Sequence, residues 1–141
     1  MSTGSVMQFA DDMLSKSAFL QEYCSDQKIY RDPGEELPLS MLGYFGKEIA
    51  SHYEAIAPAE LRIILHMIEQ GVQSRDSDIG DAVATGLIEG MIHRAEGIEG
   101  KWEKMEADLG PEARKYADAY LAWSGDVKRT TTTPPPVKTG T

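Results

Sequence analysis

The chain has 141 residues, enough for one domain whose core needs neither disulfide nor metal. Residues 1–124 hold 22 acidic and 11 basic side chains, a net charge of −11, which disfavours binding to nucleic acid or to anionic membranes. Cys24 is alone, the N-terminus lacks a secretory signal, and no run reaches membrane-span length, so a cytoplasmic location is expected.

A first helix is predicted from residue 5 to about residue 25, and Ser15-Lys16-Ser17 could interrupt it, which periodicity leaves open. Cys24 is expected to be a reduced core residue on this helix. Residues 29–38 show no period and contain the turn Asp32-Pro33-Gly34, so they are predicted to form a loop. A second helix follows from about Leu39 to Ala55.

The centre of the chain is predicted to be an αα-hairpin. Its first helix opens at Pro58 and is closed by Gln70-Gly71, and its second begins after a loop that contains Asp76. The apolar faces of the two helices are Leu61, Ile64, Leu65, Ile68 and Ile79, Val83, Leu87, Ile88, Met91, Ile92. These faces indicate the middle of a small helical core.

Two further helices are predicted after the hairpin. Ile98, Trp102, Met105 and Leu109 form an apolar seam, but Gly97 and Gly100 leave open whether that helix continues the previous one. The last helix ends near Ser124, and its Tyr116, Tyr120 and Trp123 are more typical of a core than of a binding platform.

The predicted fold is all-α, an irregular bundle of five to six helices built from stacked αα-hairpins. The helical domain covers residues 1–124. The Thr/Pro-rich tail, residues 125–141, has too few apolar side chains to offset its ordering entropy and is predicted to be disordered.

Gly86 and Gly90 form a G-x-x-x-G strip on the second hairpin helix, and each glycine costs about 1 kcal/mol relative to alanine there. We therefore expect another helix to approach closely at this strip. Packing inside the bundle is favoured, and a homodimer contact is the alternative.

Two features compete as functional sites. His66 with Glu69 and Glu89 with His93 could hold a metal in the manner of a di-iron bundle, but their spacings differ and the bridging glutamates are not evident. We predict no metal, no cofactor and no catalytic residues.

The remaining feature is a set of loop carboxylates. Asp76, Asp78 and Asp81 lie at the hairpin turn, and Glu35 and Glu36 lie in the long loop. Helix capping accounts for one or two of them, and the others suit a basic protein surface. These five residues are the predicted partner-binding site.

The segment LRIILHMIEQGVQSRDSDIGDAVATGLIEGMIH resembles the core of a family of small, acidic, helical bacterial domains that are often taken to be immunity proteins of polymorphic toxin systems. The shared pattern, (V/A)-x-x-G/S-F/L-(I/L)-E, covers Val83 to Glu89, with Leu87 where phenylalanine is common. The resemblance spans about residues 38–94 and implies neutralisation of a toxin by direct binding. Glu89 is the one residue that it singles out.

The expected function is therefore a non-enzymatic, protein-binding one, with a basic toxin domain as the partner. A helical adaptor or regulatory domain that binds another cellular protein is the alternative. A metal-dependent enzyme built on His66, Glu69, Glu89 and His93 is a remote third.

Overall fold

The computed structural model describes residues 3–24 and 37–130, and every regular element within those ranges is helical. In chain order the elements are α1 (Thr3–Lys16), α2 (Ala18–Cys24), α4 (Leu37–Ser51), η1 (Tyr53–Ala55), α5 (Pro58–Val72), α6 (Ser77–Ala82), η2 (Val83–Ile88), α7 (Glu89–Ala95), α8 (Lys101–Asp108) and α9 (Pro111–Thr130). Helices α6 and α7 are joined without a break by the π-helical turn η2. The described part of the chain therefore has seven continuous helices, where five to six were predicted.

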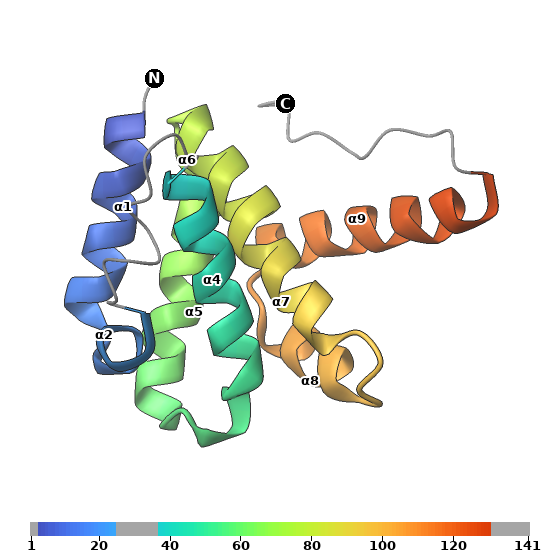
Figure 1. Ribbon diagram of the computed structural model, residues 1–141, viewed down its shortest axis with the longest axis horizontal. Coiled ribbons are helices and arrows are strands. Elements are labelled where there is room, and N and C mark those ends of the chain that lie inside the picture. The colour runs from blue at the N-terminus through green and yellow to red at the C-terminus, as the bar shows by residue number, and fades with distance from the viewer. Residues whose placement is uncertain (1–2, 25–36, 131–141) are drawn as a thin grey trace.

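The all-α bundle is confirmed. Helices α1, α4, α5 and the α6–α7 helix run side by side, whereas α9 points away from them and α8 lies below α7 (Figure 1). The predicted central hairpin consists of α5 and the α6–α7 helix. Each helix hides its apolar face against a neighbour, as amphipathic helices must.

One core runs through this bundle. Its largest fully buried side chains are Phe45, Met13, Leu20, Met41, Leu42, Ile49, Ile64, Ile68, Leu87, Ile88 and Met91. Cys24 is buried and makes no disulfide, as expected. Tyr116 and Tyr120 are also buried, which confirms that these aromatic residues belong to the core.

The first predicted helix is broken at Ser17. The Ser17 hydroxyl oxygen accepts a hydrogen bond from Leu20 N at 3.1 Å, as an N-cap side chain does at the start of a helix. The same hydroxyl donates to Glu60 Oε2 at 2.7 Å, and that oxygen also accepts from Phe19 N at 2.5 Å. A carboxylate of α5 thus supports the start of α2, which no local pattern indicated.

Glycines allow α4 and the α6–α7 helix to cross at backbone contact. A Cβ atom on Gly90 would lie 2.6 Å from Gly43 O, and one on Gly46 would lie 2.1 Å from Leu87 O. Real Cβ atoms do not approach an oxygen that closely, so only glycine fits. Internal packing of Gly90 against Gly43 is confirmed. Gly43 and Gly46 were missed because the residues that they contact on the α6–α7 helix lie more than 40 positions away in the sequence.

Two helix ends and the position of Ile98 differ from prediction, and the structure settles whether the helix after the hairpin is a separate one. Helix α9 continues to Thr130, so residues 125–130, predicted to be disordered, are helical. Gly71 does not end α5; it lies inside the helix, where an added Cβ would meet Phe9 Cζ at 2.7 Å. Gly97 and Gly100 adopt positive φ values of 80° and 78°, which separates α8 from α7. Ile98 therefore precedes α8 and is 52% exposed instead of buried.

Two predictions fall mainly outside the described ranges. The predicted loop of residues 29–38 overlaps them only at its last two residues, which belong to α4. Residues 131–141 of the predicted tail lie wholly outside them.

Candidate functional site

The predicted acidic residues of the hairpin turn come together at the start of α6. Asp76 is the N-cap, and its carboxylate accepts a hydrogen bond from Asp78 N at 2.9 Å. The other oxygen accepts a hydrogen bond from the Ser5 hydroxyl at 2.7 Å, which ties the turn to α1. Asp78 and Asp81 lie in the following turns and are half-buried.

The electrostatic environment of Asp76 favours its charged form. The Ser5 hydroxyl, followed by the backbone N–H groups of Asp78 and Ile79, holds the pKa of this carboxyl below its usual range. Asp76 therefore carries its charge at neutral pH while it caps a helix. Glu35 and Glu36, the other predicted partner-binding residues, lie outside the described residues.

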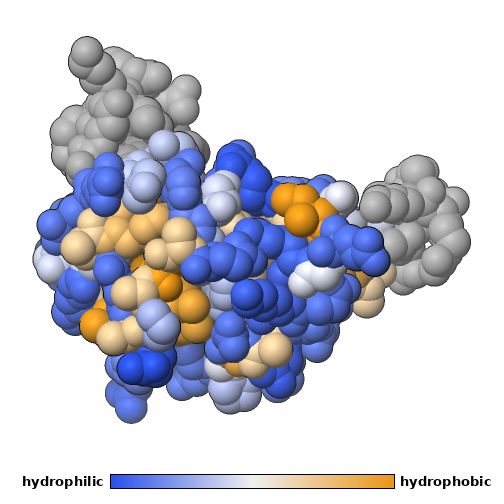
Figure 2. Space-filling model, turned by 90° about the horizontal axis from the view of Figure 1, so that it is seen from below, coloured by the Kyte–Doolittle hydropathy of each residue, from blue (hydrophilic) through white to orange (hydrophobic). Residues whose placement is uncertain are grey.

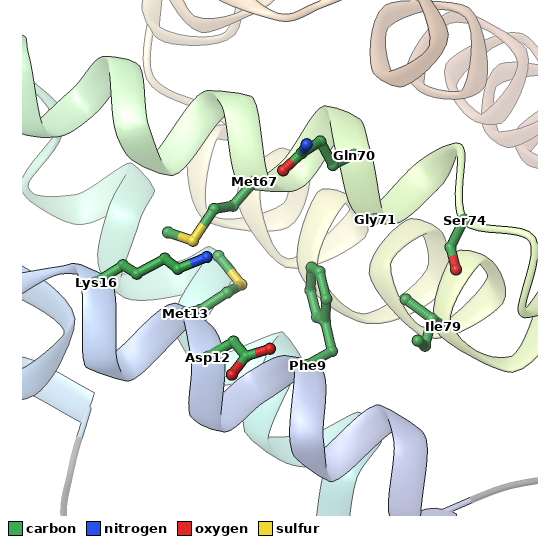
Figure 3. Close-up of a pocket in the computed structure, with 9 residues that line it drawn as sticks. All are labelled: Phe9, Asp12, Met13, Lys16, Met67, Gln70, Gly71, Ser74 and Ile79. Atoms are coloured by element: carbon green, nitrogen blue, oxygen red, sulfur yellow. The ribbon is translucent and has the colours of Figure 1, made fainter.

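A groove runs from this turn along the line where α1 meets α5. Figure 3 shows Phe9 and Met13 of α1 facing Met67 and Gly71 of α5. Ile79 closes the end nearest the turn. The complete lining is Phe9, Asp12, Met13, Lys16, Met67, Gln70, Gly71, Ser74 and Ile79, around a cavity of about 260 Å³.

The groove joins an apolar floor to a polar rim. Its floor includes two methionines, whose flexible side chains adapt to irregular partners. Asp12 lies on the rim beside Phe9, and Lys16 extends from the end opposite Ile79 along the groove, with its amine beside Met13 (Figure 3). We call this hollow the α1–α5 groove. Ser74 and Ile79 of its lining flank Asp76 in sequence, so the acidic turn lies directly beside the groove.

Sequence reasoning missed this groove. Phe9 and Met13 recur at helical spacing on the first helix, a pattern that indicates a buried face, and Met13 is indeed fully buried. Phe9 is only partly buried, and its ring packs against Gly71, where a Cβ atom would lie 2.7 Å from Phe9 Cζ. Only the spacing between two helices far apart in sequence could reveal a hollow there.

Comparison of the chain with protein-family models, curated proteins and solved structures finds no match. The resemblance to immunity proteins, over about residues 38–94, therefore rests on the sequence pattern alone. Within the described ranges, no helix combines the length and apolarity needed to span a membrane.

The remote hypothesis of a metal-dependent enzyme rested on four residues, and the structure does not bring them together into one site. They are His66, Glu69, Glu89 and His93. Glu69 accepts hydrogen bonds from Glu112 N at 2.9 Å and Ala113 N at 3.0 Å, and so caps the start of α9. His66 is exposed on α5. Among residues 3–24 and 37–130, no group of three or more His, Cys, Asp or Glu side chains is placed to hold a metal ion.

The other two residues of that set join α7 to α9. Tyr116 donates a hydrogen bond to Glu89, and the Tyr120 hydroxyl lies 3.1 Å from His93 Nε2. Burial raises the pKa of Glu89, although the Tyr116 hydroxyl and His93 act in the opposite direction. This polar cluster orients α9 on the bundle, so Glu89, the residue singled out by the resemblance, has a structural role.

Proposed function

We propose that this protein binds a basic protein domain through the α1–α5 groove and the acidic turn beside it, without bond-making of its own. In the specific form of the proposal the partner is a toxin, and binding covers its active surface. The observation that carries the proposal is the continuity of an open, methionine-containing groove with a turn that carries Asp76, Asp78 and Asp81.

The groove supplies what a protein-binding surface needs. Interfaces derive most of their binding energy from a few apolar or aromatic anchors in pockets, surrounded by polar groups that exclude water. Phe9 and Ile79, which are partly exposed, offer such apolar contact area above the buried Met67, and Asp12, Lys16 and the acidic turn supply the polar edge. A partner side chain of moderate size fits a cavity of about 260 Å³.

Charge favours a basic partner. The net charge of −11 on residues 1–124 raises the rate of encounter with a positively charged domain, and this effect weakens as salt is added. Steering acts through the whole charge distribution, whereas the bound state depends on the acids at the contact. Steering and contact can be separated experimentally, because the same charge reversal can be introduced once at the groove and once far from it.

A pair of charge reversals tests the location. Asp12→Lys adds a cation on the groove, and Glu103→Lys makes the same change at an exposed position of α8, on the other side of the bundle. We expect both variants to slow association modestly, and Asp12→Lys alone to raise the dissociation rate, by about tenfold or more. Equal dissociation rates for the two variants, measured by surface plasmon resonance with the partner, would refute the groove.

Growth rescue tests the toxin-specific form. A basic toxin encoded beside this gene would be expressed in a heterologous host with and without this chain. Rescue by the wild type and loss of rescue by Asp12→Lys are expected if binding covers the active surface of the toxin. Binding without rescue would favour the adaptor function instead.

A further inference from the structure

A second hollow lies at the opposite end of α5, next to α2. It has a volume of about 300 Å³ and is lined by Ala18, Phe19, Glu22, Tyr23, His52, Ala55, Ile56, Ala57 and Glu60. Figure 2 shows this end of the molecule from below, with a broad apolar patch over its left half and a smaller one at the upper right of an otherwise largely hydrophilic face. We call this hollow the aromatic pocket.

Three rings form its wall. Tyr23 stacks on His52 with ring centroids 4.4 Å apart, and Phe19 packs against both at 4.8 Å and 5.8 Å. Phe19 is buried, whereas Tyr23 is 38% exposed, one of the few large apolar side chains left open among the described residues. The stack holds the Tyr23 ring in place while part of it remains accessible to a ligand.

Carboxylates surround the rings. Glu22 and Glu60 line the pocket, and Glu48 Oε1 lies 3.4 Å from His52 Nε2. Glu60 is held by its two hydrogen bonds to Ser17 and Phe19, so its charge has a defined position. None of the nine lining residues is lysine or arginine.

Aromatic rings beside two carboxylates, of which Glu60 is held in place, match the chemistry of a guanidinium group. Arginine is planar, stacks on aromatic faces and donates hydrogen bonds to carboxylates in a fork that lysine cannot reproduce. A cavity of about 300 Å³ is at the small end for ligand sites, which suits one side chain better than a cofactor. We propose that the aromatic pocket binds an arginine side chain presented by a protein partner.

This inference rests on the proposed function only in that the arginine belongs to a protein. It adds a second contact point, at the other end of α5 from the acidic turn, and so predicts an arginine on the partner surface. Its test uses a small molecule and needs no partner, so it can fail while the groove proposal stands.

The probe is N-acetyl-arginine methylamide, titrated into the full ¹⁵N-labelled chain at constant ionic strength. The lysine derivative and the citrulline derivative, which keeps the shape of arginine but not its charge, are the controls. We expect saturable amide shifts confined to α2 and residues 52–60, strongest for arginine. Equal shifts with citrulline or lysine, or shifts spread over the whole acidic surface, would overturn the assignment.

Variants test the ring and the charge separately. Tyr23→Leu removes the accessible ring, and we expect it to weaken binding of the arginine probe about two- to fivefold, the range of an exposed cation–π contact. Glu22→Gln should weaken it as well, because an exposed carboxylate is lost. Ile98→Ala, at another exposed apolar residue, should leave the affinity unchanged. An unchanged affinity in Tyr23→Leu, with the fold verified by its amide spectrum, would refute the pocket.

Discussion

Replacement of Gly46 by alanine should strongly destabilise the protein, although alanine is the better helix former. In an unhindered helix this change would stabilise by about 1 kcal/mol. Here the new Cβ would lie 2.1 Å from Leu87 O, 3.0 Å from Leu87 C and 3.1 Å from Met91 N. All three atoms are backbone atoms, so no side chain can move aside to make room.

The magnitude follows from the shift that the clash requires. An ordinary contact needs about 3.4 Å or more, so α4 and the α6–α7 helix must separate by roughly an ångström along their most closely packed stretch. Overpacking typically costs about 1–3 kcal/mol. We place Gly46→Ala at the upper end, about 3 kcal/mol net, because the obstruction is rigid. That would be a substantial share of a typical domain stability of about 5–15 kcal/mol.

Gly43→Ala is the matched control on the same helix. Its Cβ would lie 3.8 Å from the nearest atom, Gly86 O, which is an ordinary contact. We expect it to leave stability unchanged or to raise it by up to about 1 kcal/mol. Urea unfolding followed by far-ultraviolet circular dichroism measures both variants. A Gly46→Ala protein as stable as Gly43→Ala would refute the close crossing of the two helices.

Two further predictions concern carboxylates. Glu69→Ala leaves two N–H groups at the start of α9 without their acceptor, so the free energy of unfolding should fall by about 1–2 kcal/mol. The control Glu103→Ala, at an exposed position of α8, should change it by less than about 0.5 kcal/mol. An equal loss of stability in the two variants would contradict the capping role of Glu69. Burial raises the pKa of Glu89, so the folded chain retains a proton at pH values where the unfolded chain has released it. Protonated Glu89 therefore favours the folded state, and this stabilisation is lost as pH rises from about 4 through the raised pKa. Glu89→Gln cannot lose a proton at this position and keeps an acceptor for Tyr116. In urea unfolding, the stability of the variant minus that of the wild type should therefore increase between about pH 4 and pH 7. A stability difference that stays constant over this range would show that the pKa of Glu89 is not raised.

Much of the fold could be predicted because its signals are local. The spacing of Ile64 and Ile68, and the proline at the first position of α5, each lie within a few turns of one helix. Apolar faces at such spacings must be buried, which led to the all-α bundle. Gly97 and Gly100 adopt positive φ values, which glycine reaches without strain, although the sequence left open whether these two residues separate the helices.

The site depended on which helices meet, and local patterns carry no such information. Glu60 and Glu69 resemble any solvated acids of a helix, yet they lie nine residues apart, about two and a half turns, and so face opposite sides of α5. Each caps a different helix, at Phe19 and at Glu112, more than 40 residues away. Their roles follow from geometry alone.

The amino-acid sequence by itself determined the helical class, the apolar faces and the strong negative charge, because each depends on residue type and short-range spacing. Tertiary structure alone decided that Phe9 borders an open groove, that Tyr23 stacks on His52 beside Glu60, and that Gly46 touches Leu87. Those contacts join segments distant in the chain, and hollows arise from the distances between helices.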